Sequence, residues 1–171
     1  VNGSLAPEST VSVETGATVG GTGTISGLVA VATGGIIAPG AGSAGTLTLA
    51  NTGAAALSLT NSTFACELTG TGASDRIDIA GTLTLTGENV IALQLPNGTA
   101  PAGTYTLITY SALNSAAGTL VLDRTYPNAT FAVGDTSVTL TIIGSGTTSN
   151  LVWKGDAVAN RWNATDDNWT P

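Results

Sequence analysis

The chain has 171 residues, of which only 9% are charged, and 11 Asp and Glu outnumber 4 Lys and Arg. This length is enough for one domain with a hydrophobic core. The net charge of −7 argues against nucleic acid and anionic membrane surfaces as partners, because both are bound through Lys and Arg.

The absent residue types exclude further classes. There is no His, so Ser-His-Asp and Cys-His sites cannot form, and the single Cys allows no internal disulfide. No apolar run approaches the roughly 18 residues of a membrane-spanning helix. The chain holds no Met, even at position 1, and no signal-peptide pattern, so we expect a processed product or a fragment of an exported protein.

Alternating apolar and polar residues predict short β-strands along the whole chain, and no helical spacing is sustained. Gly, Asn and Pro separate these strands, as at 34–35, 39–40, 97–98 and 134. The apolar positions that share one face are, in chain order, Leu47 and Leu49; Leu57 and Leu59; Phe64, Cys66 and Leu68; Ile77 and Ile79; Leu83 and Leu85; Ile91, Leu93 and Leu95; and Val138, Leu140 and Ile142.

A short repeat accompanies this alternation. The pattern Gly-Thr-x-x-(Leu/Ile) recurs as 21-GTGTI-25, 45-GTLTL-49, 81-GTLTL-85 and 118-GTLVL-122. These imperfect repeats begin at positions 21, 45, 81 and 118, and repeats a few tens of residues apart indicate a repetitive architecture. The low aromatic content disfavours a β-propeller. We therefore predict an all-β parallel β-helix (β-solenoid), with a β-sandwich as the alternative for residues 88–145.

The domain organisation follows from the same patterns. Residues 1–150 are predicted to form a single β-solenoid domain, in which 1–87 are the most repeat-like and 88–145 have longer strands. Residues 151–171 form a separate terminal segment that contains all three Trp residues. This segment is interpreted as a junction between units or as a contact between subunits.

The text of the chain resembles a known family. The stretch 16-GATVGGTGTISGLVAVATGGIIAPGAGSAGTLTL-49 and its continuation 63-TFACELTGTGASDRIDIAGTLTLTG-87 are similar to autotransporter-associated β-strand repeat proteins. The stretches 103-GTYTLITY-110 and 134-GDTSVTLTI-142 resemble the closing strands of such units, and 151-LVWKGDAVANRWNATDDNW-169 resembles the start of a new one. The resemblance implies a right-handed parallel β-helix that is secreted or displayed on a bacterial surface, without catalytic residues.

The candidate chemical sites are few. Cys66 is in phase with Phe64 and Leu68, so we expect a buried structural thiol. Asp75 and Asp78 flank Arg76, and a solvated ion pair is favoured over the carboxylate pair of a polysaccharide-cleaving enzyme.

Asp166 and Asp167 offer oxygen ligands of the kind that Ca²⁺ takes, but their spacing follows neither the EF-hand nor the nonapeptide repeat, so a polar turn is favoured. We expect no enzyme, metal or cofactor. Six sequons are candidate glycosylation sites, at Asn2, Asn61, Asn97, Asn128, Asn163 and Asn168.

The functional prediction concerns the ends of the solenoid, because solenoid ends expose unpaired strand edges unless they are capped. Neither end carries an evident cap, so we expect head-to-tail association of copies into an extracellular filament or surface fibre. An adhesin or glycan-binding stalk segment of a larger surface protein is the alternative. The residues expected at the contact between copies are Val1, Leu5, Val11, Val13, Trp153, Trp162 and Trp169.

Overall fold

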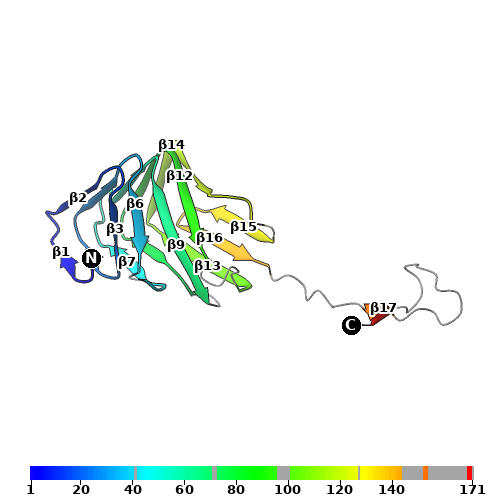
Figure 1. Cartoon of the computed structure of the whole chain (residues 1–171). Coiled ribbons are helices and arrows are strands. Elements are labelled where there is room, and N and C mark those ends of the chain that lie inside the picture. The colour runs from blue at the N-terminus through cyan, green and yellow to red at the C-terminus, as the bar shows by residue number, and fades with distance from the viewer. Residues whose placement is uncertain are drawn as a thin grey trace, which may run out of the picture.

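The computed structural model describes residues 1–40, 42–70, 73–95, 101–126 and 128–143, together with the backbone of 152–153 and 169–170. This part of the chain consists of strands and turns, and no helix in it is long and apolar enough to cross a membrane. The strands wind into stacked coils, and strands of successive coils pair in parallel (Figure 1). The prediction of an all-β parallel solenoid is confirmed.

Each coil has three sides, which belong to two sheets. Sheet A is the first side and has the strand order β1-β4-β7-β11-β13-β16-β15. Sheet B covers the other two sides, with the order β2-β5-β8-β12-β9-β6-β3, while β14 pairs with β12 and β10 with β9.

The strands of sheet A are β1 (Ser4–Leu5), β4 (Thr24–Ile25), β7 (Thr46–Leu49), β11 (Arg76–Ile79), β13 (Gly103–Thr109), β15 (Ala129–Val133) and β16 (Ser137–Ile142). Those of sheet B are β2 (Thr10–Val13), β3 (Thr18–Gly21), β5 (Leu28–Val31), β6 (Ile36–Pro39), β8 (Leu57–Thr60), β9 (Thr63–Gly70), β10 (Ala73–Ser74), β12 (Thr82–Gln94) and β14 (Ala112–Leu122). A separate pair consists of β17 (Val152–Trp153) and β18 (Trp169–Thr170).

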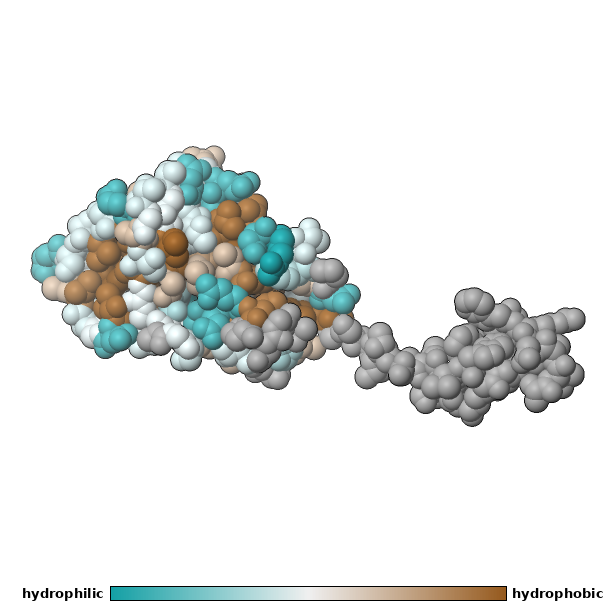
Figure 2. Space-filling model, in the orientation of Figure 1, coloured by the Kyte–Doolittle hydropathy of each residue, from teal (hydrophilic) through white to brown (hydrophobic). Residues whose placement is uncertain are grey.

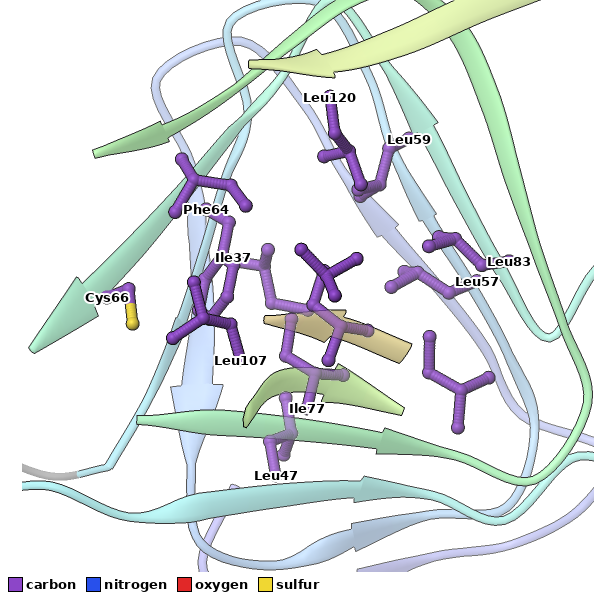
Figure 3. Packing of buried hydrophobic residues seen from close by; sticks show 14 of the residues in the cluster. Ile37, Leu47, Leu57, Leu59, Phe64, Cys66, Ile77, Leu83, Leu107 and Leu120 are labelled. Atoms are coloured by element: carbon purple, nitrogen blue, oxygen red, sulfur yellow. The ribbon is translucent and has the colours of Figure 1, made fainter. Parts of the chain in front are cut away.

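The core consists of aliphatic ladders that run from coil to coil. Parallel in-register pairing places equivalent inward residues above one another, so each coil covers the apolar side chains of its neighbour. Figure 3 shows part of this packing. The three main ladders are Val11–Val29–Leu57–Leu83–Leu113, Val19–Ile37–Phe64–Ile91–Leu122 and Leu47–Ile77–Ile108–Val138.

One corner between the two sides of sheet B repeats a left-handed backbone conformation. Gly16, Gly34, Asn61 and Gly87 have φ angles of 75°, 74°, 43° and 66°. Gly and Asn are the residues that adopt this region most readily. The amides of Gly16, Gly34 and Asn61 each donate to a carbonyl of the next coil, at 2.9 to 3.1 Å, so the corners continue the stacking between the two sides of sheet B.

A buried asparagine holds three coils together beside this corner. The Asn89 side chain is fully buried, and its Oδ1 accepts hydrogen bonds from the Ser62 amide and hydroxyl, both at 3.0 Å. Its Nδ2 donates to the carbonyls of Thr86 and Thr119, at 3.2 and 3.4 Å. Ser62 and Thr119 belong to the coils on either side, so one amide group ties both neighbours.

The chain departs from parallel winding after β14. Strands β16 and β15 fold back as an antiparallel hairpin, in which β16 pairs with β13 and β15 pairs with β16. The hairpin extends sheet A rather than forming the second layer of a sandwich, and β12, β13 and β14 still pair in parallel with earlier or later coils. The sandwich alternative for residues 88–145 is therefore wrong, although its last two strands are antiparallel.

One hydrophobic cluster runs from Val13 to Leu140, so the described coils share a single core. The strands after residue 81 are longer, since β12 and β14 each cover two sides of a coil. The predicted domain boundary near residue 150 lies outside the described residues.

Asn89→Ala is expected to lower the free energy of unfolding by roughly 1–3 kcal/mol, because the buried Ser62 amide and hydroxyl lose their acceptor. Equilibrium chemical denaturation followed by circular dichroism measures the change. Asn114→Ala, on the exposed surface of β14, is the matched control and should change stability by less than about 0.5 kcal/mol. Equal effects of the two substitutions would contradict the bridging role of Asn89.

Candidate functional site

The first coil forms one end of the solenoid, which we call the head. Strand β1 is the last strand of sheet A, and β2 and β3 end the two branches of sheet B. Among the described residues no strand pairs with their outer edges, although the Val1 amino group donates a hydrogen bond to the Gly20 carbonyl. Open edges of this kind present rows of N–H and C=O groups to which another strand can pair.

The predicted contact residues of the first coil differ in exposure. Val1 is 37% exposed, while Leu5 and Val11 are partly buried and pack against the core. Val13 is buried, so its side chain belongs to the core and only its strand backbone lies at the head. The side chains of Trp153, Trp162 and Trp169 lie outside the described residues.

The opposite end, which we call the tail, is stepped. Sheet A continues beyond the last coil through β16 and β15, whereas sheet B ends at β14 within the described part of the chain. An apolar groove, here named the tail groove, lies between β14 and β15. Its lining includes Leu120, Leu122, Tyr126, Ala129 and Phe131, with Arg124 beside them.

The outer face of sheet A carries the one ion pair predicted from the sequence. Arg76 and Asp78 lie on this face with side chains 42% and 29% exposed, and the guanidinium Nη2 donates to the Asp78 carboxylate. The Thr109 hydroxyl donates to the other Asp78 oxygen at 2.8 Å. These three side chains line a shallow groove together with Thr48. Because Arg76 and Asp78 are paired and both partly exposed to solvent, the expectation of a solvated ion pair is confirmed.

Asp75 has a different role. It is only 4% exposed, and its two carboxylate oxygens accept hydrogen bonds from the amides of Gly45 and Glu67, both at 2.9 Å. Burial raises the pKa of the Asp75 carboxyl, the two backbone hydrogen bonds oppose this rise, and the Glu67 charge adds to it. The group clamps the starts of β7 and β11 to β9. It therefore does not share a cleft with the exposed Asp78 carboxylate.

Cys66 is fully buried, as its phase predicted, and its thiol lies 3.6 Å from the Asp75 carbonyl. Burial raises the pKa of the thiol far above its usual range, and the charges of Asp75 and Glu67 raise it further. Because the thiolate is the reactive form, this group is inert in the folded protein.

Three of the six sequons lie among the described residues. The Asn2 side chain accepts a hydrogen bond from the Thr22 amide at 3.3 Å, and the Asn61 side chain accepts one from the Glu88 amide at 3.1 Å. Asn128 is exposed and has a φ of 65°. Asn97, Asn163 and Asn168 lie outside the described residues, as do Asp166 and Asp167.

Two features escaped the sequence reasoning. Asn89 shares the inward phase of Ile91 and Leu93 but is polar, and the tail groove depends on a hairpin that returns beside β14. The alternation of Ala129, Phe131 and Val133 with Thr130 and Ala132 is a signal that points to β15. In the described part of the chain, no three His, Cys, Asp or Glu side chains group closely enough to hold a metal ion.

The described surface visible in Figure 2 carries no single large apolar or hydrophilic patch. On the face in Figure 2, apolar residues gather in several patches between weakly polar and hydrophilic ones.

A scan against protein-family models finds no family that matches the chain, and a search of curated proteins finds no significant match. Among the described residues, the arrangement presents unpaired outer strand edges at both ends and one polar groove on the outer face of sheet A.

Cys66 in the folded protein is expected to resist a maleimide reagent at pH 8 and to react at the rate of a free thiol after denaturation. Mass spectrometry of timed samples follows the labelling. A Ser115→Cys variant in a Cys66→Ala background is the control, since residue 115 is exposed on β14 and should react at once. Rapid labelling of Cys66 in the native protein would contradict its placement in the core.

Proposed function

We propose that the protein is a structural subunit of an extracellular bacterial β-solenoid filament or surface fibre, in which copies associate head to tail. The observation that supports this most directly is the head, where no described strand pairs with the outer edges of β1, β2 and β3, which lie at the same end of the core. Another set of stacked strands is the partner that satisfies all three edges at once.

The composition of the head strands supports the same conclusion. Proteins that avoid edge-to-edge pairing place Lys, Pro or other charged residues on their edge strands. Strands β1, β2 and β3 read SL, TVSV and TVGG, with no charge and no Pro. Glu8 and Glu14 are the only charged side chains of the first coil, and both lie in turns. The head therefore lacks the features that oppose pairing.

Head and tail are different surfaces, so a contact between them is heterologous and extends into a fibre. Strand β15 is the outermost strand of sheet A at the tail and is the acceptor for β1 of the next copy. The assignment to a bacterial surface rests on the resemblance to autotransporter-associated β-strand repeats. Asp75 is buried on backbone amides and the partly exposed Asp78 is paired with Arg76, so neither is assigned a catalytic role.

Ser12→Pro is expected to shorten or abolish fibres while the coils remain folded. The carbonyls of Ser9 and Val13 accept hydrogen bonds from the amides of Leu28 in β5 and Ala32 just after it, so by the alternation of a β-ladder the Ser12 amide points to the open edge. Proline removes this donor and is tolerated on edge strands. Sedimentation velocity and electron microscopy measure fibre length, and circular dichroism checks the fold.

Ser12→Thr retains the amide and is the control, so it should assemble like the unsubstituted chain. Fibres of normal length formed by Ser12→Pro would show that the edge of β2 is not part of the contact.

A second function, glycan binding by an adhesin segment, is favoured by the groove around Arg76 and Asp78. The pair places charged donors and acceptors on the outer face of sheet A, next to the Thr48 and Thr109 hydroxyls. In a glycan-array experiment, Asp78→Asn should abolish binding to the sugars that the unsubstituted chain binds. Asp123→Asn, which removes a carboxylate near Arg124, is the control and should retain binding. An array with no bound sugar contradicts this second function.

A further inference from the structure

The step at the tail has a defined size. Strands β16 and β15 lie beyond β13 in sheet A, and they have no counterpart beyond β14 in sheet B among the described residues. Sheet B is therefore two strands shorter than sheet A at this end. The outer edge of β14 is unpaired over the described chain, and this strand has 11 residues.

The tail groove occupies this step. Leu122, Tyr126 and Phe131 are only partly buried there, although each packs against the core. The Arg124 guanidinium lies 5.0 Å from the centre of the Tyr126 ring, and the Tyr126 hydroxyl donates to Asp123 at 2.8 Å. The groove thus has an apolar floor, a free strand edge on one side and a charged rim.

We propose that the Trp-rich segment 151–171 of the same chain fills the tail groove and completes sheet B above β14. Residue 143, from which the chain leads to this segment, lies beside the groove. The Ile143 amide donates to the Asn128 carbonyl at 2.8 Å, and the next residue, Ala129, lines the groove. The eight residue-to-residue steps from position 143 to position 151 span up to about 26 Å when extended, which exceeds the roughly 10 Å of two strand spacings.

The segment also has the right strand content. Strands β17 and β18 pair with each other in antiparallel fashion, with Trp153 opposite Trp169, and neither has another strand partner among the described residues. A lone two-stranded pair is marginally stable in water and needs a sheet or a core to support it. Sheet B lacks two rows beyond β14, and the segment offers two short strands of two residues each.

Its side chains suit an apolar floor. The segment holds all three Trp residues of the chain, together with Leu151 and Val152. Large aromatic rings contribute most to such contacts because they bury wide apolar areas. Filling the step also brings sheet B level with β15, so that the head of the next copy meets an even end. Only this last consequence rests on the proposed filament.

The experiment uses the whole chain and its intrinsic fluorescence, since every Trp belongs to the segment. At a concentration where sedimentation shows monomers, the native emission is expected to be blue-shifted from that of the unfolded chain and protected from iodide quenching. Phe131→Asp and Leu122→Asp should each shift the emission to the unfolded position and remove the protection. Leu28→Asp, on the exposed outer face of β5, is the matched control and should leave both unchanged.

Circular dichroism and the unreactive Cys66 thiol confirm that each variant remains folded. Native emission at the unfolded position would overturn the proposal, as would folded groove variants whose emission does not change. An emission that moves to the unfolded position on dilution would assign the groove to the segment of a second copy and overturn the same-chain assignment. Fibres with solvent-exposed Trp would support the filament and contradict docking of the segment in the groove. Docked Trp without fibres would support the docking and contradict the filament.

Discussion

The hydrogen bonds of this fold run between coils, and the rest of the structure depends on that direction. A single coil cannot satisfy its own backbone groups or bury its own apolar side chains. Stacking solves both problems at once, because the in-register ladder that pairs Val29 with Leu57 also covers one side chain with the next. The same dependence leaves the outer edges of β1, β2, β3 and β14 without a strand partner among the described residues.

The buried polar side chains Asn89 and Asp75 form hydrogen bonds that connect the coils. Asn89 satisfies groups from three coils, and Asp75 accepts amides from strands that lie 8 and 30 residues away in the chain. Each group replaces ladder hydrogen bonds at a place where the chain turns a corner. Buried polar residues that are fully engaged in this way hold one register. Their side chains are therefore not available to a substrate.

The sequence predicts the local elements well and the stacking less well. Alternation placed Cys66, Ile77 and Leu83 inside, and each is buried. The repeated text, however, does not mark equivalent positions: Ile25 stacks on Leu49 in sheet A, as the repeat implies, but the next residue of this ladder is Ile79, while 81-GTLTL-85 turns into sheet B. Strand pairing depends on loop lengths between coils, and these vary too much for a fixed period to reveal.

The candidate sites show the same limit. Arg76 and Asp78 are two positions apart in one strand, so period-two geometry predicts their common face. The burial of Asp75 and Asn89 depends on contacts with residues of other coils, and the groove at the tail depends on a hairpin that reverses the winding. Asp75 and Asn89 share the inward phase of Ile77 and Ile91, but their hydrogen-bond partners lie on other coils and have no local sequence signature.

Electron microscopy of the purified 171-residue chain at high concentration distinguishes head-to-tail stacking from isolated copies. If sheet A continues across the contact, each copy adds seven strands at about 4.8 Å each, so head-to-tail stacking predicts uniform filaments with an axial repeat of about 34 Å. Short single rods at every concentration would contradict it.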